Sequence, residues 1–138
     1  MRTKLSVVMA GVSLLLAAGP VVAHHSFAAE FDSAQPVTLS GTETKMEWIN
    51  PHAWIHLDVK KPDGTVESWE IETGKPSALI RRGFNRNSLP PGVEITVQGF
   101  RAKDGGMKAN GRDLTFKDGK TLFVGSSGTG APGDTPEK

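Results

Sequence analysis

The sequence predicts an all-β domain with one short helix, folded as an OB-like barrel of five to six strands. Sixteen Gly and nine Pro among 138 residues disfavour a helical bundle. Apolar residues alternate with a period of two over several segments, and a helical period occurs only after the third of them. A β-sandwich is the alternative architecture, but six strands are few for it, and a helix after strand three favours the barrel.

The first predicted strand, 37–48, changes its apolar face along its length. Its apolar residues are odd-numbered up to Leu39 and even-numbered from Met46 onwards. A strand that switches faces needs a bulge or a sharp bend, and glycine accommodates a bend at the lowest cost. We therefore expect a long first strand that bends at Gly41.

The next two strands form a predicted hairpin. Ala53–Lys60 alternates strictly, which places its odd-numbered residues inward and its even-numbered residues outward. Lys61–Gly64 has the composition of a hairpin turn. Val66–Thr73 follows as the third strand, with Trp69 and Ile71 facing inward.

A helix of about two turns is predicted from Pro76 to Gly83, because Pro favours a helix start and Gly the position just past its end. Leu79, Ile80 and Phe84 are expected to supply its apolar contacts.

The remaining strands follow the helix. Glu94–Ala102 is predicted as strand four with Ile95 and Val97 inward, and Met107–Phe116 as strand five. Thr121–Val124 is a short sixth candidate.

The first 23 residues, 1–23, have the pattern of a secretory signal peptide. A basic start at 2–4 precedes the apolar stretch 5–18, which is too short for a membrane span, and 21–23 suits a cleavage site. A retained N-terminal anchor is the alternative. Cleavage after residue 23 predicts a periplasmic or secreted protein that begins at His24 and has no further membrane association.

The mature chain is expected to have an N-terminal arm, 24–35, a barrel, 36–124, and a disordered tail, 125–138. The tail has no large apolar residue to offset the entropy lost on ordering. Cleavage removes two of the 16 basic residues and none of the 15 acidic ones, so the net charge becomes −1. This balance argues against a nucleic-acid partner. The lack of Cys excludes a disulfide scaffold, a thiolate metal site and a cysteine nucleophile.

Polar and aromatic side chains gather on the outward face of the second and third strands. Strand parity allows two registers. In one, Trp54 lies opposite Glu70 and His52 opposite Glu72. In the other, His56 lies opposite Glu70 and Trp54 opposite Glu72. Both registers predict a single outward patch, which the alternative interpretation treats as an ordinary hydrated strand face.

Imidazole and carboxylate groups together suit a transition metal. His24 at the new N-terminus offers its α-amine and its ring nitrogen, and His25 adds a second ring; these nitrogen ligands suit copper(II). His52 and His56 lie four apart on a strand, about 13 Å, so only one of them is expected to complete the set. Glu70 is a further ligand or orients an imidazole. A mobile, solvated terminus is the alternative.

A second function class is a module that uses Trp54 as an aromatic anchor for a periplasmic protein or glycan partner, with Glu72 and Asn50 on the same face. A redox enzyme comes third. The sequence has no phosphate loop, serine nucleophile motif or HExxH motif, so we assign no catalytic residue and favour a non-enzymatic binding domain.

Three segments carry a family resemblance: HHSFAAEFD (His24–Asp32), EWINPHAW (Glu47–Trp54) and WEIETGKPSALIRRGF (Trp69–Phe84). Through them the chain resembles a family of small exported bacterial proteins of unknown function, over about His24 to Leu122. The resemblance implies a secreted or periplasmic single domain with an OB-like barrel. It implies no activity, ligand or catalytic residue.

Overall fold

The computed structural model describes residues 27–126, so the predicted leader, His24 and His25, and most of the predicted tail lie outside the described residues. The predicted mostly-β fold with a short helix after strand three is confirmed, and one further helical turn precedes β1. The elements are α2 (Phe27–Glu30), β1 (Phe31–Glu47), β2 (Trp54–Lys60), β3 (Val66–Glu72), α3 (Pro76–Arg81), β4 (Glu94–Ala102), β5 (Lys108–Phe116) and β6 (Thr121–Phe123).

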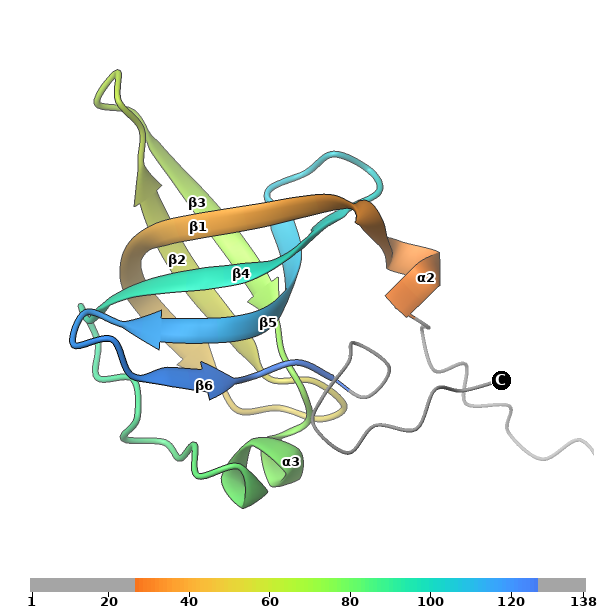
Figure 1. Ribbon diagram of the computed structural model, residues 1–138, viewed down its shortest axis with the longest axis vertical. Coiled ribbons are helices and arrows are strands. Elements are labelled where there is room, and N and C mark those ends of the chain that lie inside the picture. Colours follow the sequence, from red (N-terminus) through yellow and green to blue (C-terminus); the bar gives the residue numbers. More distant parts are fainter. Residues whose placement is uncertain (1–26, 127–138) are drawn as a thin grey trace, which may run out of the picture.

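The strands form one sheet in the order β3-β2-β1-β4-β5-β6, and the sheet closes into a barrel-like ring because β3 also pairs with β5. The β3–β5 pairing is parallel and the other pairings are antiparallel. β5 pairs with β4 along one edge; along its other edge, its first half pairs with β3 and its second half with β6. In Figure 1, β1, β4, β5 and β6 cross in front of β2 and β3, and α3 lies at one end of the ring.

The core fills the inside of this ring. Ile55 and Leu57 on β2 are buried, whereas His56 between them is half-buried on the outer surface, so the predicted alternation of β2 is confirmed. Leu79 and Phe84 bring the α3 segment into the same core. The expectation for Ile80 was wrong: its side chain is 60% exposed, because a six-residue helix presents only one narrow stripe to the core.

β1 changes faces at a bulge and not at the predicted glycine. Its register with β2 shifts between Glu43 and Lys45, which leaves Thr44 as the extra residue. Gly41 has another role: a Cβ there would lie 2.2 Å from the carbonyl oxygen of Asp58, so only glycine allows β1 and β2 to approach this closely. A bulge inserts one extra residue into a strand and needs no glycine, so β1 can change faces at Thr44.

The register of β2 and β3 is the second of the two predicted alternatives. His56 pairs with Glu70, and Trp54 pairs with Glu72. Glu72 pairs on its other side with Asn110 of β5, where the ring closes.

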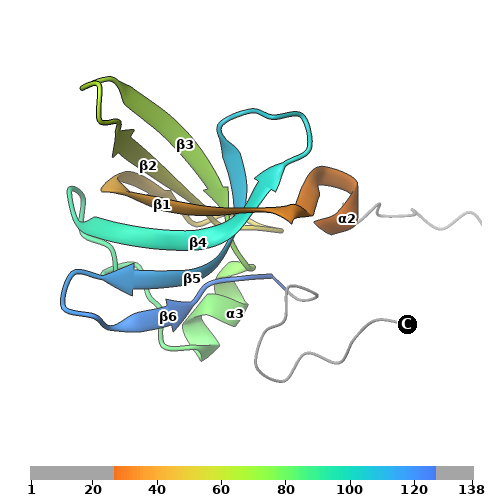
Figure 2. The same ribbon diagram turned by 45° about the horizontal axis from the view of Figure 1, so that its top comes forward.

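The folded part of the chain extends beyond the predicted barrel, 36–124, at both ends. β1 begins at Phe31, so the last residues of the predicted arm belong to a strand. Phe27 stacks on Phe31 at 5.8 Å between ring centroids and meets the edge of Phe100 at 5.5 Å, which docks α2 on the barrel. Figure 2 shows α2 well separated from α3.

At the C-terminal end, the carbonyl of Gly125 is buried and accepts a hydrogen bond from Arg82 Nη1 at 2.6 Å. The first residues of the predicted tail therefore pack on the barrel. Within residues 27–126, no helix is long and apolar enough to cross a membrane.

Candidate functional site

A shallow pocket of about 230 Å³ lies on the outer surface where four strands meet. We call it the His56 pocket; it is lined by Glu47 of β1, Trp54 and His56 of β2, Glu70 of β3 and Lys108 of β5. The registers explain this grouping, since Trp54 pairs with Glu47 on one side while His56 pairs with Glu70 on the other. Ring closure through β5 then adds Lys108 beside Glu70.

His56 faces Glu47 across the pocket. The distance from His56 Nε2 to Glu47 Oε2 is 3.6 Å, which is longer than a hydrogen bond. The Nε2 atom is buried and has no hydrogen-bond partner among the described residues, although the side chain as a whole is 27% exposed. A hydrogen bond from Lys45 holds the pKa of Glu47 below its usual value, with a smaller contribution from His56. Glu47 is therefore a carboxylate at neutral pH.

The N-terminal arm reaches the same pocket. Glu30, the last residue of α2, forms an ion pair with Lys108, and this hydrogen bond raises the pKa of Lys108. The Lys108 ammonium in turn lies 5.2 Å from the ring centroid of Trp54, within the range of a cation–π contact. Lys103 also holds α2, through a hydrogen bond from its backbone N–H to the carbonyl of Glu30.

His52 and Glu72 form a separate group, in which the carboxylate of Glu72 is largely buried. His52 Nδ1 lies 3.1 Å from the carbonyl oxygen of Thr73 and 3.9 Å from Glu72 Oε1. Asn110 Nδ2 donates a hydrogen bond of 3.3 Å to Glu72 Oε1. Burial raises the pKa of Glu72, and His52 opposes this effect.

The single outward patch predicted from strand parity is therefore divided into two groups. Parity places Glu72 on the outer face, but the side chains of Asn110 and His52 lie against it there, and Glu72 is only 8% exposed. Asn50, predicted for the same face, is exposed in the bend before β2 and does not line the His56 pocket.

Three residues of this region were not singled out from the sequence: Glu30, Glu47 and Lys108. The inward parity of Met46 and Trp48 was a usable signal for Glu47, because it turns Glu47 outward beside β2. Glu30 and Lys108 had no local signal, since both reach the pocket through the pairing of distant strands.

The barrel residues do not complete a metal site by themselves. Within residues 27–126, no group of three or more His, Asp or Glu side chains is arranged to hold a metal ion. His56 and Glu47 supply one nitrogen and one carboxylate oxygen 3.6 Å apart, a span that one ion bonded to each at about 2 Å bridges.

A protein-family model matches residues 12–112, and its description is a family of unknown function, DUF6152. No curated protein matches the chain.

Proposed function

The chain belongs to DUF6152, a family of unknown function, and we propose, from the leader pattern and the environment of His56, that it is an exported binding domain that holds a transition metal, copper(II), between its mature N-terminus and the His56 pocket. Export to the periplasm or beyond rests on the leader pattern of residues 1–23. Cleavage there makes His24 the terminal residue.

The observation that carries the proposal is the environment of His56. A buried imidazole nitrogen normally has a hydrogen-bond partner, because leaving it without one costs about 1–3 kcal/mol. His56 Nε2 lacks such a partner within residues 27–126 and faces a carboxylate 3.6 Å away. A metal ion bonded to Nε2 and to Glu47 satisfies both groups. Glu70 lines the same pocket and is the nearest further carboxylate on β3.

The docked arm supports the N-terminal half of the site. Phe27 is fixed by two aromatic contacts, and Glu30, in the same helical turn, reaches Lys108 in the pocket. His24 precedes Phe27 by three residues, so covalent geometry keeps its Cα within about 11 Å of the Cα of Phe27. The α-amine and ring of His24, assisted by His25, would supply the nitrogen ligands that copper(II) prefers in tetragonal geometry.

The alternative function, with Trp54 as an aromatic anchor for a protein or glycan partner, is less well supported. The ring of Trp54 already has the Lys108 ammonium against it, and Glu30 of the arm holds that ammonium in place. A partner that stacked on the face that Lys108 occupies would have to displace both groups.

The test is a calorimetric titration of the native-start protein with copper(II). A Gly-Ser extension before His24 should weaken binding, because it moves the α-amine away from the His24 ring. His56→Ala should weaken binding by about tenfold or more, equivalent to about 1.4 kcal/mol. Glu47→Gln should weaken it by a smaller factor. His52→Ala is the matched control, since His52 contacts Thr73 and not the His56 pocket.

Unchanged affinity in the extended protein, in His56→Ala and in Glu47→Gln would reject the copper proposal. A loss confined to the extended protein would place the metal on the N-terminus alone. If copper affinity is unaffected throughout while Trp54→Ala abolishes binding to a defined periplasmic partner, the interaction module replaces the metal site.

A further inference from the structure

Three segments pack together at the end of the ring where α3 lies, and we call this surface the α3 end. They are the connection between β1 and β2, 48–53, the connection between β3 and β4, 73–93, and β6 with the residues after it, 121–126. The N–H of Gly74 donates a hydrogen bond to the carbonyl of Val124, and the ring centroids of Trp48 and Phe84 lie 5.8 Å apart. Figures 1 and 2 both show α3 as the outermost element at this end.

The α3 end carries positive charge and no negative charge. Its three segments contain none of the 15 acidic residues of the chain, but they contain four basic residues: Lys75, Arg81, Arg82 and Arg86. The mature chain has 14 basic and 15 acidic residues, so without these four it has 10 basic and 15 acidic ones, a net charge of −5. The expectation of no membrane association considered the net charge of the chain and not this separation of charge.

The positive charges of the α3 end are not neutralised within residues 27–126. None of the ion pairs in that range includes any of the four basic residues. Lys75 and Arg81 are exposed. The guanidinium of Arg86 is also exposed and lies over the ring of Trp48, 5.6 Å from its centroid, a contact that orients the cation without removing its charge. This end therefore attracts anions.

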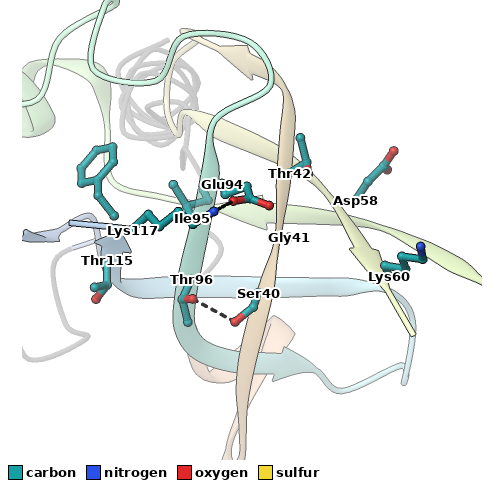
Figure 3. A pocket seen from close by; sticks show the side chains of 11 residues that line it. Ser40, Gly41, Thr42, Asp58, Lys60, Glu94, Ile95, Thr96, Thr115 and Lys117 are labelled. Carbon is teal, nitrogen blue, oxygen red and sulfur yellow. Dashed lines mark hydrogen bonds and ion pairs between the residues drawn. The ribbon is translucent and has the colours of Figure 1, made fainter. Parts of the chain in front are cut away.

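The outer surface around β1, β2 and β4 has the opposite character. Two carboxylates, Asp58 and Glu94, and two ammonium groups, Lys60 and Lys117, line a hollow there. Glu94 and Lys117 form an ion pair, which Figure 3 shows. The charges on this surface cancel, so its lysines provide a reference for those of the α3 end.

The α3 end also exposes two large apolar side chains. Ile80 is 60% exposed and Ile49 is 51% exposed. Single exposed apolar residues are ordinary, but these two lie among the unpaired cations, since Arg81 follows Ile80 and Arg86 covers Trp48, the neighbour of Ile49. Cations beside exposed apolar side chains suit the interface of an anionic bilayer, where the cations meet phosphates and the apolar groups meet the acyl boundary.

The position of α3 favours a flat partner over a peptide or a small anion. Peptides and small ligands are held in grooves and pockets, whereas α3 protrudes at its end of the ring. A small anion would satisfy the cations but would leave both isoleucines in water. A bilayer accommodates the two kinds of side chain together.

We propose that the α3 end docks the protein on a bilayer surface rich in anionic phospholipid. Lys75, Arg81 and Arg86 bind the lipid phosphates, while Ile80 enters the apolar boundary beneath the headgroups. The α3 end shares no residue with the His56 pocket, so docking is independent of the proposed copper site.

The test is sedimentation of the metal-free mature protein with vesicles of phosphatidylcholine alone or of phosphatidylcholine and phosphatidylglycerol in equal parts. The protein should bind only the anionic vesicles, and binding should weaken as salt rises from about 50 to about 500 mM, because salt screens the cations. The double variant Lys75→Gln/Arg81→Gln should weaken binding by about tenfold or more, since each cation near an anionic surface contributes about fivefold. Ile80→Ser should weaken it by about threefold or more.

The matched control is Lys60→Gln/Lys117→Gln, which removes the same charge from the surface in Figure 3. It should change vesicle affinity by about twofold or less, and His56→Ala should leave it unchanged. Melting temperatures verify that each variant is folded. The proposal is overturned by equal binding to both kinds of vesicle, by equal losses in the two double variants, or by binding to soluble polyglutamate without binding to anionic vesicles, which would assign the α3 end to an acidic protein.

Discussion

Glu43 is a carboxyl group sealed inside the described part of the chain. Its side chain is 1% exposed, and Oε2 has no hydrogen-bond partner there. Burial raises its pKa above the ordinary value of 4.5, against smaller opposing effects of the Gly92 N–H and of His56. Because the folded state holds this proton more tightly than the unfolded state, the contribution of Glu43 to stability falls as pH rises from 4.5 through the folded-state pKa.

The first prediction follows from that sign. Glu43→Gln should raise the melting temperature at pH 7, because the contribution of Glu43 to stability falls as pH rises above 4.5 whereas glutamine does not titrate, and the gain should disappear near pH 4. Each 1 kcal/mol corresponds to about 4–8 °C in a domain of this size. Glu94→Gln is the control: Lys117 lowers the pKa of this exposed carboxylate, so its removal should give no gain at pH 7. An equal gain for Glu43→Gln at both pH values would contradict the account.

The second prediction concerns the two faces of β2. Leu57 is 1% exposed in the core, so Leu57→Ala should lower the free energy of unfolding by about 2–5 kcal/mol. The next residue, Asp58, lies on the outer face, and Asp58→Ala should change it by about 0.5 kcal/mol or less. Urea denaturation measures both. Similar losses would mean that burial on β2 does not follow the alternation.

Local pattern was sufficient for the elements whose environment is set by their own strand or turn. The alternation of β2 predicted which residues it buries, and the helix signals predicted α3 to within two residues. It was insufficient where distant segments meet. The burial of Glu72 depends on Asn110 of β5, and the position of Glu30 beside Lys108 depends on how the ring closes. Neither contact has a signature within its own segment.

The third prediction tests α2 as the element that carries the arm to the pocket. Phe27→Ala removes both ring contacts of α2, with Phe31 and Phe100. The helical turn should then detach while the barrel remains folded, because Phe27 is not part of the main core cluster. The amide hydrogen of Lys103, which donates to the Glu30 carbonyl, should exchange with solvent faster. Copper affinity should fall as well. Unchanged exchange and unchanged affinity would show that the arm does not position the N-terminus.

At the scale of the whole molecule, the account requires export and cleavage. The fourth prediction is that intact-mass analysis of the protein from the periplasm of the producing cell gives a chain beginning at His24, because residues 21–23 suit the cleavage positions. A start at Ser26 or later would remove both terminal histidines and with them the nitrogen ligands of the proposed site.

The most direct measurement is the metal content of the protein purified from the periplasm with its native N-terminus and no added tag. The account predicts about one copper ion per chain, as for one filled site, and a higher melting temperature with copper than without it, since a ligand that prefers the folded state stabilises that state. In the His56→Ala variant the copper content should fall sharply. A chain that begins at His24, carries no copper and gains no stability when copper(II) is added would contradict the central claim.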